Sequence, residues 1–376
     1  MSIAPFKFST APRIVFGDGE AKTLATHASM LGPRPFVVTD PGIVNLGLLS
    51  EPLRSFLPTE PVVFDGIGAD PSRAMLEAAL QAARECNATG VLGFGGGSSL
   101  DVAKLVALLL GTDQALDDVW GVGQAPGPRS PLALVPTTAG TGSEVTPVSI
   151  ITVGETEKRG VSSPLLLPDV AVLDPTLTNG LPPDITAATG IDAMVHAIEA
   201  YASKNANNNP VSRTLAREAL RLLADNIERA VDGEPSARGP MLLGSMLAGQ
   251  AFANSPVAAV HALAYPLGGI FKVPHGLSNA VLLPHVLAFN SEEPRARRSY
   301  EELAPLLKRK GADAFIDRLD EISVSCGLEP GMSALGVAEE DLDRMADDAM
   351  KQTRLLVNNP RKLTWNDARA IYAAAL

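Results

Sequence analysis

The order of the apolar runs constrains the fold of this chain more than any other feature. Short runs rich in β-branched residues at 36–40, 61–65, 90–94 and 132–135 alternate with stretches of helical spacing, such as 72–86. Unbroken apolar runs are typical of strands buried on both faces of a parallel sheet. Their alternation with helices predicts right-handed βαβ units. We therefore expect the first half to be a doubly wound, Rossmann-like α/β domain.

The second half has a different pattern. After two further strands at residues 148–153 and 170–174, the sequence has helical periodicity only. The expected helices span residues 184–202, 210–231, 240–254, 300–307, 312–326 and 339–351. The sequence therefore predicts an all-α C-terminal domain, and it divides the chain into domains 1–179 and 180–376.

Charge, hydropathy and cysteine content exclude several classes of partner. The 376 residues carry a net charge of −11 without a cluster of Lys and Arg of the kind that binds a phosphate backbone, so we expect no nucleic-acid partner. The longest apolar stretch, residues 105–111, is too short to cross a membrane. Cys86 and Cys326 form no CxxC motif, and residues 1–12 lack the pattern of a signal peptide. These features predict a cytoplasmic protein.

A glycine-rich turn, GFGGGSSLD at residues 93–101, follows a strand and opens a helix. Consecutive glycines let backbone N–H groups approach a pyrophosphate without Cβ clashes, and the helix N-terminus adds partial positive charge. Because the turn lies at the carboxyl end of a strand, it predicts a dinucleotide site. Ser98 stands where a standard GxGxxG motif has its third glycine. The alternative is a tight turn in which Ser98 and Asp101 form a capping pair.

Two other features favour a nucleotide site. Residues 136–144, PTTAGTGSE, follow the next strand, and their hydroxyl groups and glycines can hydrogen-bond a nucleotide. Asp40 ends an early strand, where a carboxylate can accept hydrogen bonds from a ribose diol and repel a 2′-phosphate, which favours NAD over NADP. The alternative for Asp40 is a turn residue before Pro41 and Gly42.

Histidines in the second half suggest a metal site. Four of the five histidines lie between residues 196 and 285. Asp192 and His196 are four residues apart in a helical stretch, so they share one face and can bind one ion. The alternative for this pair is a solvated helix face or a buried polar pair. His285, after Pro284 at an expected helix start, is a candidate ligand, cap or donor to a ligand.

His261 and His275 would lie about 21 Å apart along a continuous helix, so they can meet at one ion only if the helix breaks between them. Four residues can supply that break: Pro266, Gly268, Gly269 and Pro274. Three imidazoles and one carboxylate suit a divalent transition metal such as iron or zinc, and no cysteine ligand is present to favour a thiolate-zinc site. Spacing alone leaves the shared site as one possibility.

Taken together, these motifs resemble those of the iron-containing (group III) alcohol dehydrogenase family over nearly the whole chain. The matching segments are residues 95–101, 136–144, 174–175, 190–199, 261–269 and 274–276. The resemblance implies a nucleotide-binding N-terminal domain, a helical C-terminal domain, an active site in the cleft between them and a homodimer. It also implies an ion, Fe²⁺ or Zn²⁺, whose ligands are Asp192, His196, His261 and His275.

The resemblance also implies NAD as the cofactor. The positions that it implies for cofactor binding are Asp40, Gly96, Gly97, Ser98, Asp101, Thr137, Thr138, Lys158 and Leu177. Two residues depart from the family pattern. Tyr265 replaces a histidine that many members carry four residues after the metal ligand, and Asp70 replaces an asparagine. A phenol titrates near about 10, so Tyr265 can orient the substrate, pass a proton through water or only line the pocket.

The expected function is metal-dependent, NAD-linked alcohol dehydrogenation, with hydride transfer between nicotinamide and a small alcohol/aldehyde or hydroxyacid/oxoacid pair. On the same scaffold the alternatives are hydroxyacid–oxoacid transhydrogenation, 4-hydroxybutyrate or lactaldehyde oxidation, and maleylacetate reduction. Tyr265 is similar to a tyrosine of transhydrogenase-like members. From a different class, the alternative is a catalytically inactive metal- or nucleotide-binding protein.

Overall fold

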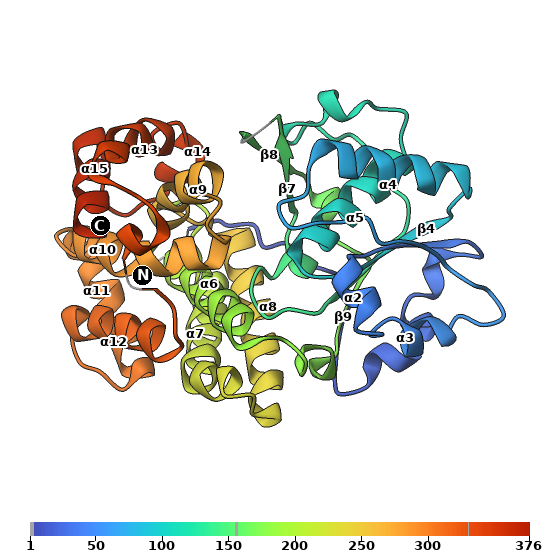
Figure 1. The fold of residues 1–376 in the computed structure, drawn as a ribbon, viewed down its shortest axis with the longest axis horizontal. Helices are drawn as coiled ribbons and strands as arrows, with labels where there is room; N and C mark the ends of the chain where they lie inside the picture. The colour runs from blue at the N-terminus through green and yellow to red at the C-terminus, as the bar shows by residue number, and fades with distance from the viewer. Residues whose placement is uncertain (1–3, 155–156, 330) are drawn as a thin grey trace. The chain divides into compact units, whose positions relative to one another are not determined.

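The computed structural model describes residues 4–154, 157–329 and 331–376. The chain divides into two compact units, Ser9–Gly180 and Leu181–Leu376, and the second also includes the segment that ends at Phe8. Lys7 joins that segment to the second unit, because its backbone N–H donates to Asn207 Oδ1 at 2.8 Å and its carbonyl accepts from Asn207 Nδ2 at 2.8 Å. Figure 1 shows the helices and strands of both units.

A parallel sheet forms the centre of the first unit. Its strands run in the order β1-β9-β6-β4-β2-β3, and each neighbouring pair is parallel. The strands are β1 (Ile14–Phe16), β2 (Pro35–Val38), β3 (Val62–Phe64), β4 (Gly90–Gly95), β6 (Leu132–Pro136) and β9 (Val170–Leu173). All except β1 were expected from the apolar runs. The three residues of β1 are too few to show a period.

Side chains alternate between the two faces of this sheet, so each face has its own core. Val91 packs on one face with α4 and α5, and Leu92 packs on the other face with α1, α2 and α3. Figure 1 shows α4 and α5 on one side of β4, and α2 and α3 on the other. These helices are α1 (Leu24–His27), α2 (Pro41–Asn45), α3 (Ser50–Arg54), α4 (Arg73–Glu85) and α5 (Gly97–Leu110). The doubly wound α/β prediction is thereby confirmed.

A second, smaller sheet in this unit has the order β5-β8-β7. Its strands are β5 (Gly121–Val122), β7 (Val148–Val153) and β8 (Glu157–Ser162). The strand expected at 148–153 is β7, but it pairs antiparallel with β8 and does not join the parallel sheet. The sequence of β8, EKRGVS, is mostly polar, so no apolar run marks it.

The second unit consists of helices in the part of the chain that the structure describes. They are α6 (Pro183–Ala202), α7 (Pro210–Val231), α8 (Pro235–Asn254), α9 (Ala259–Phe271), α10 (His275–Asn290), α11 (Pro294–Leu303), α12 (Ala312–Ser325), α13 (Leu342–Ala349), α14 (Thr353–Leu356) and α15 (Trp365–Ala374). The prediction of an all-α C-terminal domain is confirmed. Within the described residues, none of the helices has the length and apolar character needed to span a membrane.

Prolines explain several differences between the expected and observed helix limits. A proline removes one helical hydrogen bond, so it predicts a boundary. Yet Pro240, Pro266 and Pro284 all lie inside helices. The helix that was expected to begin at residue 240 therefore begins earlier. The expectation that His285 lies at a helix start was wrong, because it lies inside α10. Tertiary packing of these largely buried helices outweighs the local cost of each proline.

Candidate metal centre and nucleotide-binding loops

Helix α6 places Asp192 and His196 on one face, as their spacing predicts. Both side chains are buried, and Nδ1 of His196 lies 4.0 Å from Oδ2 of Asp192. The ring of His196 stacks between two others, with centroids 4.3 Å from Phe252 and 4.7 Å from His261. The pair is therefore part of a buried cluster and not a solvated helix face.

His261 lies in the first turn of α9, and His275 is the first residue of α10. The chain does break between the two histidines, as expected, but Pro266 lies inside α9. The break falls at Lys272, which adopts the left-handed conformation with a φ of 60°, and at Pro274, the residue before α10. The expectation that Pro266, with its neighbouring glycines, breaks the helix was wrong, whereas Pro274 does lie at the break.

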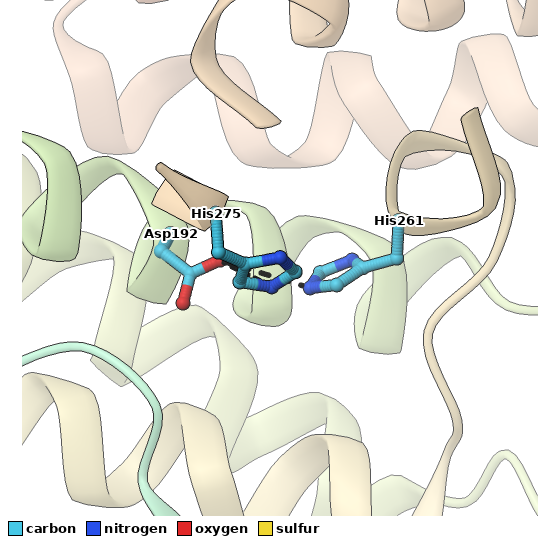
Figure 2. A group of neighbouring side chains, drawn as sticks. All are labelled: Asp192, His261 and His275. Atoms are coloured by element: carbon cyan, nitrogen blue, oxygen red, sulfur yellow. Dashed lines mark ion pairs between the residues drawn. The ribbon is translucent and has the colours of Figure 1, made fainter. Parts of the chain in front are cut away.

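Three of the predicted ligands converge (Figure 2). One ligand atom from each of Asp192, His261 and His275 lies within 4.8 Å of the others. Oδ1 of Asp192 is 3.8 Å from Nε2 of His261 and 3.6 Å from Nε2 of His275. Nitrogen and oxygen ligands bind a divalent ion at about 2.0–2.2 Å, so two atoms on one ion lie roughly 3–4 Å apart. The spacing of these atoms fits one ion, with His196 adjacent.

The state of His261 supports this fit. Its Nδ1 lies 2.7 Å from Oε2 of Glu199, and both Glu199 oxygens also accept from backbone N–H groups, so Nδ1 is the donor in this contact. In the neutral ring, Nε2 then presents a lone pair. Nε2 is buried and makes no hydrogen bond to any described residue, an arrangement that is costly unless another group binds there. A metal ion is such a group.

Two residues that lie beside these ligands, Glu199 and Asn279, have no role predicted by the sequence motifs. Glu199 is seven residues after Asp192, so helical periodicity could have placed it on the same face of α6. Asn279, one turn after His275 in α10, donates from Nδ2 to Oδ1 of Asp192 at 2.6 Å. Both side chains are buried. Asn279 could not be found by spacing from Asp192, because the two residues lie on different helices.

The electrostatics of the cluster suit a cation. Burial alone would raise the pKa of Asp192, but the neighbouring imidazoles and the hydrogen bond from Asn279 outweigh it and hold the pKa below its usual 3.8. Burial alone would lower the pKa of His261. The hydrogen bond and charge of Glu199, together with the charge of Asp192, reverse that effect and raise the pKa above 6.5. The surroundings therefore favour positive charge at this point.

The other candidate residues of the helical unit lie at different distances from this cluster. Tyr265, one turn after His261 in α9, has its ring centroid 6.3 Å from that of His275. Tyr265 is partly exposed. His285 lines a separate pocket with Asp317 and Asp320, and burial lowers its pKa. His27 pairs with Glu20 in the first unit, at 2.8 Å.

In the α/β unit, Asp40 and the glycine-rich turn meet where the strand order reverses. The chain passes from β2 to the edge strand β3 and returns to β4 on the other side of β2. Such a reversal leaves a crevice at the carboxyl ends of the strands, which is where doubly wound sheets bind nucleotides. Ser99 Oγ donates to Oδ2 of Asp40 at 3.5 Å. Asp40 also accepts from the N–H of Ile43 at 3.1 Å, so it is the N-cap of α2, where the alternative prediction had a turn residue before Pro41 and Gly42.

The two predicted nucleotide loops are packed together. A Cβ placed on Gly97 would lie 2.7 Å from Cγ2 of Thr141, and one placed on Gly96 would lie 3.6 Å from Cγ2 of Thr138. The N–H of Thr137 donates to the carbonyl of Gly95 at 3.0 Å. Glycine at position 97 is therefore required by close approach of the neighbouring loop as well as suited to a phosphate.

Asp101 holds the second loop against α5. Its carboxylate accepts from Ser143 Oγ at 2.6 Å and from the N–H of Ile150 at 2.8 Å. Ser143 also receives a hydrogen bond from the fully buried Lys104, at 2.7 Å. No side chain caps the N-terminus of α5, so the alternative in which Ser98 and Asp101 form a capping pair is wrong. That end of the helix keeps its backbone donors available for a ligand.

Two further predicted cofactor residues have protein partners. Lys158 in β8 donates to Asp70 Oδ1 at 2.6 Å and to Thr152 Oγ1 at 2.8 Å. Asp70, one of the two departures from the family pattern, therefore forms an ion pair with a predicted cofactor residue. Leu177 is buried in the core that covers one face of the sheet, which leaves little of its side chain for a ligand.

Comparison with known protein families extends over almost the whole chain. Residues 11–175 match the family described as iron-containing alcohol dehydrogenase, and residues 186–376 match the C-terminal part of the Fe-containing alcohol dehydrogenase family. The second match spans the helices that carry Asp192, His261 and His275.

Relatives are similar along their full length. The long-chain-alcohol dehydrogenase 1 of Geobacillus thermodenitrificans is 38% identical, with 100% of this chain and 97% of that protein covered. The NAD-dependent methanol dehydrogenase of Bacillus methanolicus is 32% identical, with 98% and 99% covered. Among solved structures, a 1,3-propanediol oxidoreductase has a TM-score of 0.95 at 33% identity, with 99% of this chain and 100% of that chain covered.

Proposed function

We propose that this chain, which belongs to the iron-containing alcohol dehydrogenase family, transfers hydride between NAD and a small alcohol or carbonyl substrate. The observation that carries the proposal is the convergence of Asp192, His261 and His275 beside His196 in a family of metal-dependent oxidoreductases. The convergence of these side chains argues against a binding protein that has lost catalysis.

The ion is held, in this proposal, by the carboxylate of Asp192 and the ring nitrogens of His196, His261 and His275. This donor set suits Fe²⁺, with Zn²⁺ as the alternative, because imidazole and carboxylate bind both and no thiolate is present. The family description supports iron. Metal analysis of the purified protein distinguishes the two ions.

NAD is proposed to bind across the loops of the α/β unit. Two features support this: the uncapped N-terminus of α5 and the position of Asp40 at the reversal of strand order. The residues assigned to cofactor binding are Asp40, Gly96, Gly97, Ser98, Asp101, Thr137, Thr138, Lys158 and Leu177. Of these, Asp101 acts by holding the loop that follows β6. A related sulfoacetaldehyde reductase from Bifidobacterium kashiwanohense, 29% identical with a TM-score of 0.90, was solved in complex with NAD⁺.

In this proposal the side chains of the protein hold the ion, orient the substrate and transfer a proton. When bound, the ion supplies Lewis-acid polarisation of the substrate oxygen and NAD supplies the hydride acceptor. Asp192 and the histidines would hold that ion in one place, and their fixed positions would set where the substrate oxygen can bind. Tyr265 is one turn from His261 on the same helix. Its hydroxyl can orient the substrate or pass a proton from the substrate to water.

The substrate class is a small alcohol and aldehyde pair or a hydroxyacid and oxoacid pair. Relatives carry names that refer to long-chain alcohols, methanol, 1,3-propanediol and sulfoacetaldehyde, so similarity does not select one of them. Tyr265 in place of histidine favours hydroxyacids within this range, and a hydroxyacid–oxoacid transhydrogenase is the second candidate. A maleylacetate reductase-like reaction is the third.

Two further proposals concern the cellular location and the oligomeric state. We propose a cytoplasmic location, because Cys86 and Cys326 are both free thiols, which suits a reducing compartment. A homodimer is expected by similarity to the family, and light scattering of the purified protein tests it.

A substrate screen tests the proposed function. The metal-loaded protein is incubated with NAD and a panel of alcohols and hydroxyacids, and NADH is followed by its absorbance. We expect NADH formation with at least one compound. Turnover that requires a hydroxyacid and an oxoacid together, without free NAD, would favour the transhydrogenase. Bound metal and NAD without any turnover would contradict the proposal.

A further inference from the structure

Glu199 is a buried carboxylate on which three hydrogen-bond donors converge. Its Oε2 accepts from the N–H of Ala258 at 2.9 Å and lies 2.7 Å from Nδ1 of His261. Its Oε1 accepts from the N–H of Val260 at 2.7 Å. Only 5% of the residue is exposed, so water competes little for these bonds.

Glu199 connects two helices that both carry predicted metal ligands. It is seven residues after Asp192 and three after His196, so the three side chains lie on one face of α6. The two oxygens of Glu199 accept from backbone N–H groups at the start of α9. The N-cap residue of this helix, Ala258, has no side chain that can accept a hydrogen bond. One carboxylate therefore ties the start of α9, and the ring of His261, to the helix that presents the other ligands.

The protonation of His261 follows from this contact. Because both oxygens of Glu199 accept from backbone N–H groups, Nδ1 of His261 is the donor in this contact, and Nε2 is left as the atom that faces Oδ1 of Asp192, 3.8 Å away. In the other tautomer, a hydrogen on Nε2 would occupy the position needed by an ion. Nδ1 would then carry no hydrogen and could not donate to the carboxylate of Glu199. The contact thus selects the tautomer in which His261 can bind a metal.

We propose that Glu199 is the positioning residue of the metal centre, which sets the tautomer and orientation of His261 and thereby the affinity for the divalent ion. The proposal rests on the metal site of the proposed function and adds a residue that acts only through His261. A purely structural role, as a cap for the start of α9, would stabilise the helix without changing metal affinity beyond the general loss of stability.

The test compares Zn²⁺ affinity in two variants of the full chain. Glu199→Gln keeps the shape of the side chain but removes its charge and replaces one acceptor with a donor. The matched control is Tyr372→Phe, which removes the 2.7 Å hydrogen bond from Tyr372 Oη to the carbonyl of Leu263 and so loosens α9 without touching His261. Zn²⁺ dissociation constants are measured by competition with a chelator, and thermal unfolding is recorded for each protein.

We expect Glu199→Gln to weaken Zn²⁺ binding by roughly 10- to 100-fold, and Tyr372→Phe to bind Zn²⁺ as the unsubstituted chain does. Equal affinities in all three proteins, or equal losses in both variants, would overturn the proposal. A chain that binds no Zn²⁺ before any substitution would overturn the proposed metal site as well, so the two failures are distinguishable.

A second measurement reads the tautomer in the unsubstituted chain and uses a variant only to assign the signal. The chain has five histidines, so ¹⁵N-histidine labelling gives a simple two-bond ¹H–¹⁵N spectrum of the metal-free protein. We expect the neutral His261 ring, recorded at alkaline pH, to carry its single hydrogen on Nδ1, and the signal is assigned by its absence from the spectrum of His261→Gln. A neutral ring whose single hydrogen lies on Nε2 would overturn the proposal.

Discussion

Nε2 of His275 lies 3.6 Å from Oδ1 of Asp192, although the first residue begins α10 and the second lies in the middle of α6. A helix that continued through residue 275 would place His275 far from His261, and therefore far from Asp192, whose Oδ1 lies 3.8 Å from Nε2 of His261. The contact therefore depends on the end of α9 at Lys272. The positions of three helices, rather than one sequence motif, therefore assemble the candidate metal centre.

Tyr265→Phe tests the role of the phenol. The ring centroid of Tyr265 is 6.3 Å from that of His275, so loss of the hydroxyl is expected to leave metal content unchanged. If the hydroxyl orients substrate or moves a proton, kcat falls by about tenfold or more, or its pH profile shifts. Steady-state kinetics across pH on the best substrate from the screen measure this. Unchanged kinetics would make Tyr265 a residue that only lines the pocket.

Asp40→Ser tests the choice of cofactor. Serine can still cap α2 by accepting from Ile43, so the fold is expected to persist. Loss of the carboxylate removes its repulsion of a 2′-phosphate, and the ratio of kcat/KM for NAD to that for NADP is expected to fall by roughly tenfold or more. A ratio equal to that of the unsubstituted chain would show that Asp40 serves only as a helix cap.

Gly97→Ala tests the close packing of the two nucleotide loops. The new Cβ would lie 2.7 Å from Cγ2 of Thr141, which is expected to cost about 1–3 kcal/mol of stability and to raise KM for NAD. The double variant with Thr141→Ala removes the two closest contacts, Cγ2 at 2.7 Å and Oγ1 at 2.9 Å, and leaves Cβ at 3.2 Å, so it should recover part of the stability. Gly180→Ala is the control, because nothing lies within 4 Å of its added Cβ. Equal effects of both glycine substitutions would contradict the packing argument.

Glu144→Gln has an effect on stability that depends on pH. Burial raises the pKa of Glu144 from 4.5 to about 7 in the folded protein, in spite of its own backbone N–H and the charge of Lys104. The folded state then holds a proton that the unfolded state releases. The contribution of Glu144 to the free energy of unfolding is therefore fully present below about pH 4.5. It decreases as the pH rises to about 7, by about 3 kcal/mol in total.

Glutamine does not ionise, so Glu144→Gln is expected to raise the Tm relative to the unsubstituted chain more at pH 8 than at pH 5. Thermal unfolding by circular dichroism at the two pH values measures the difference. Glu340→Gln, at an exposed position, controls for the loss of a carboxyl group. A Tm difference that is the same at both pH values would contradict a buried, protonated Glu144.

Features repeated over short distances could be predicted from the sequence. The apolar runs located the central strands, and a spacing of four residues placed Asp192 and His196 on one face of α6. Glu199 has the same periodicity and could have been found with it. The position of the break before His275 could not, because Lys272 adopts a left-handed conformation that its residue type does not indicate.

Features that depend on tertiary contacts could not be predicted. Asn279 reaches Asp192 from another helix, and Asp101 contacts Ser143 and Ile150 from elements far away in the sequence. Asp101 resembled a cap because local spacing was the only information on its partners. Strand β8 was missed since its pairing with β7, rather than an apolar run, defines it.

Metal content is the most direct test of the central claim, which is that one divalent ion is held by Asp192, His196, His261 and His275. The purified chain is compared with His261→Ala and with His27→Ala, whose histidine pairs with Glu20 in the other unit. We expect about one Fe²⁺ or Zn²⁺ per chain, retained in His27→Ala and lost together with NAD reduction in His261→Ala. A His261→Ala protein that is metal-free and fully active would contradict the account.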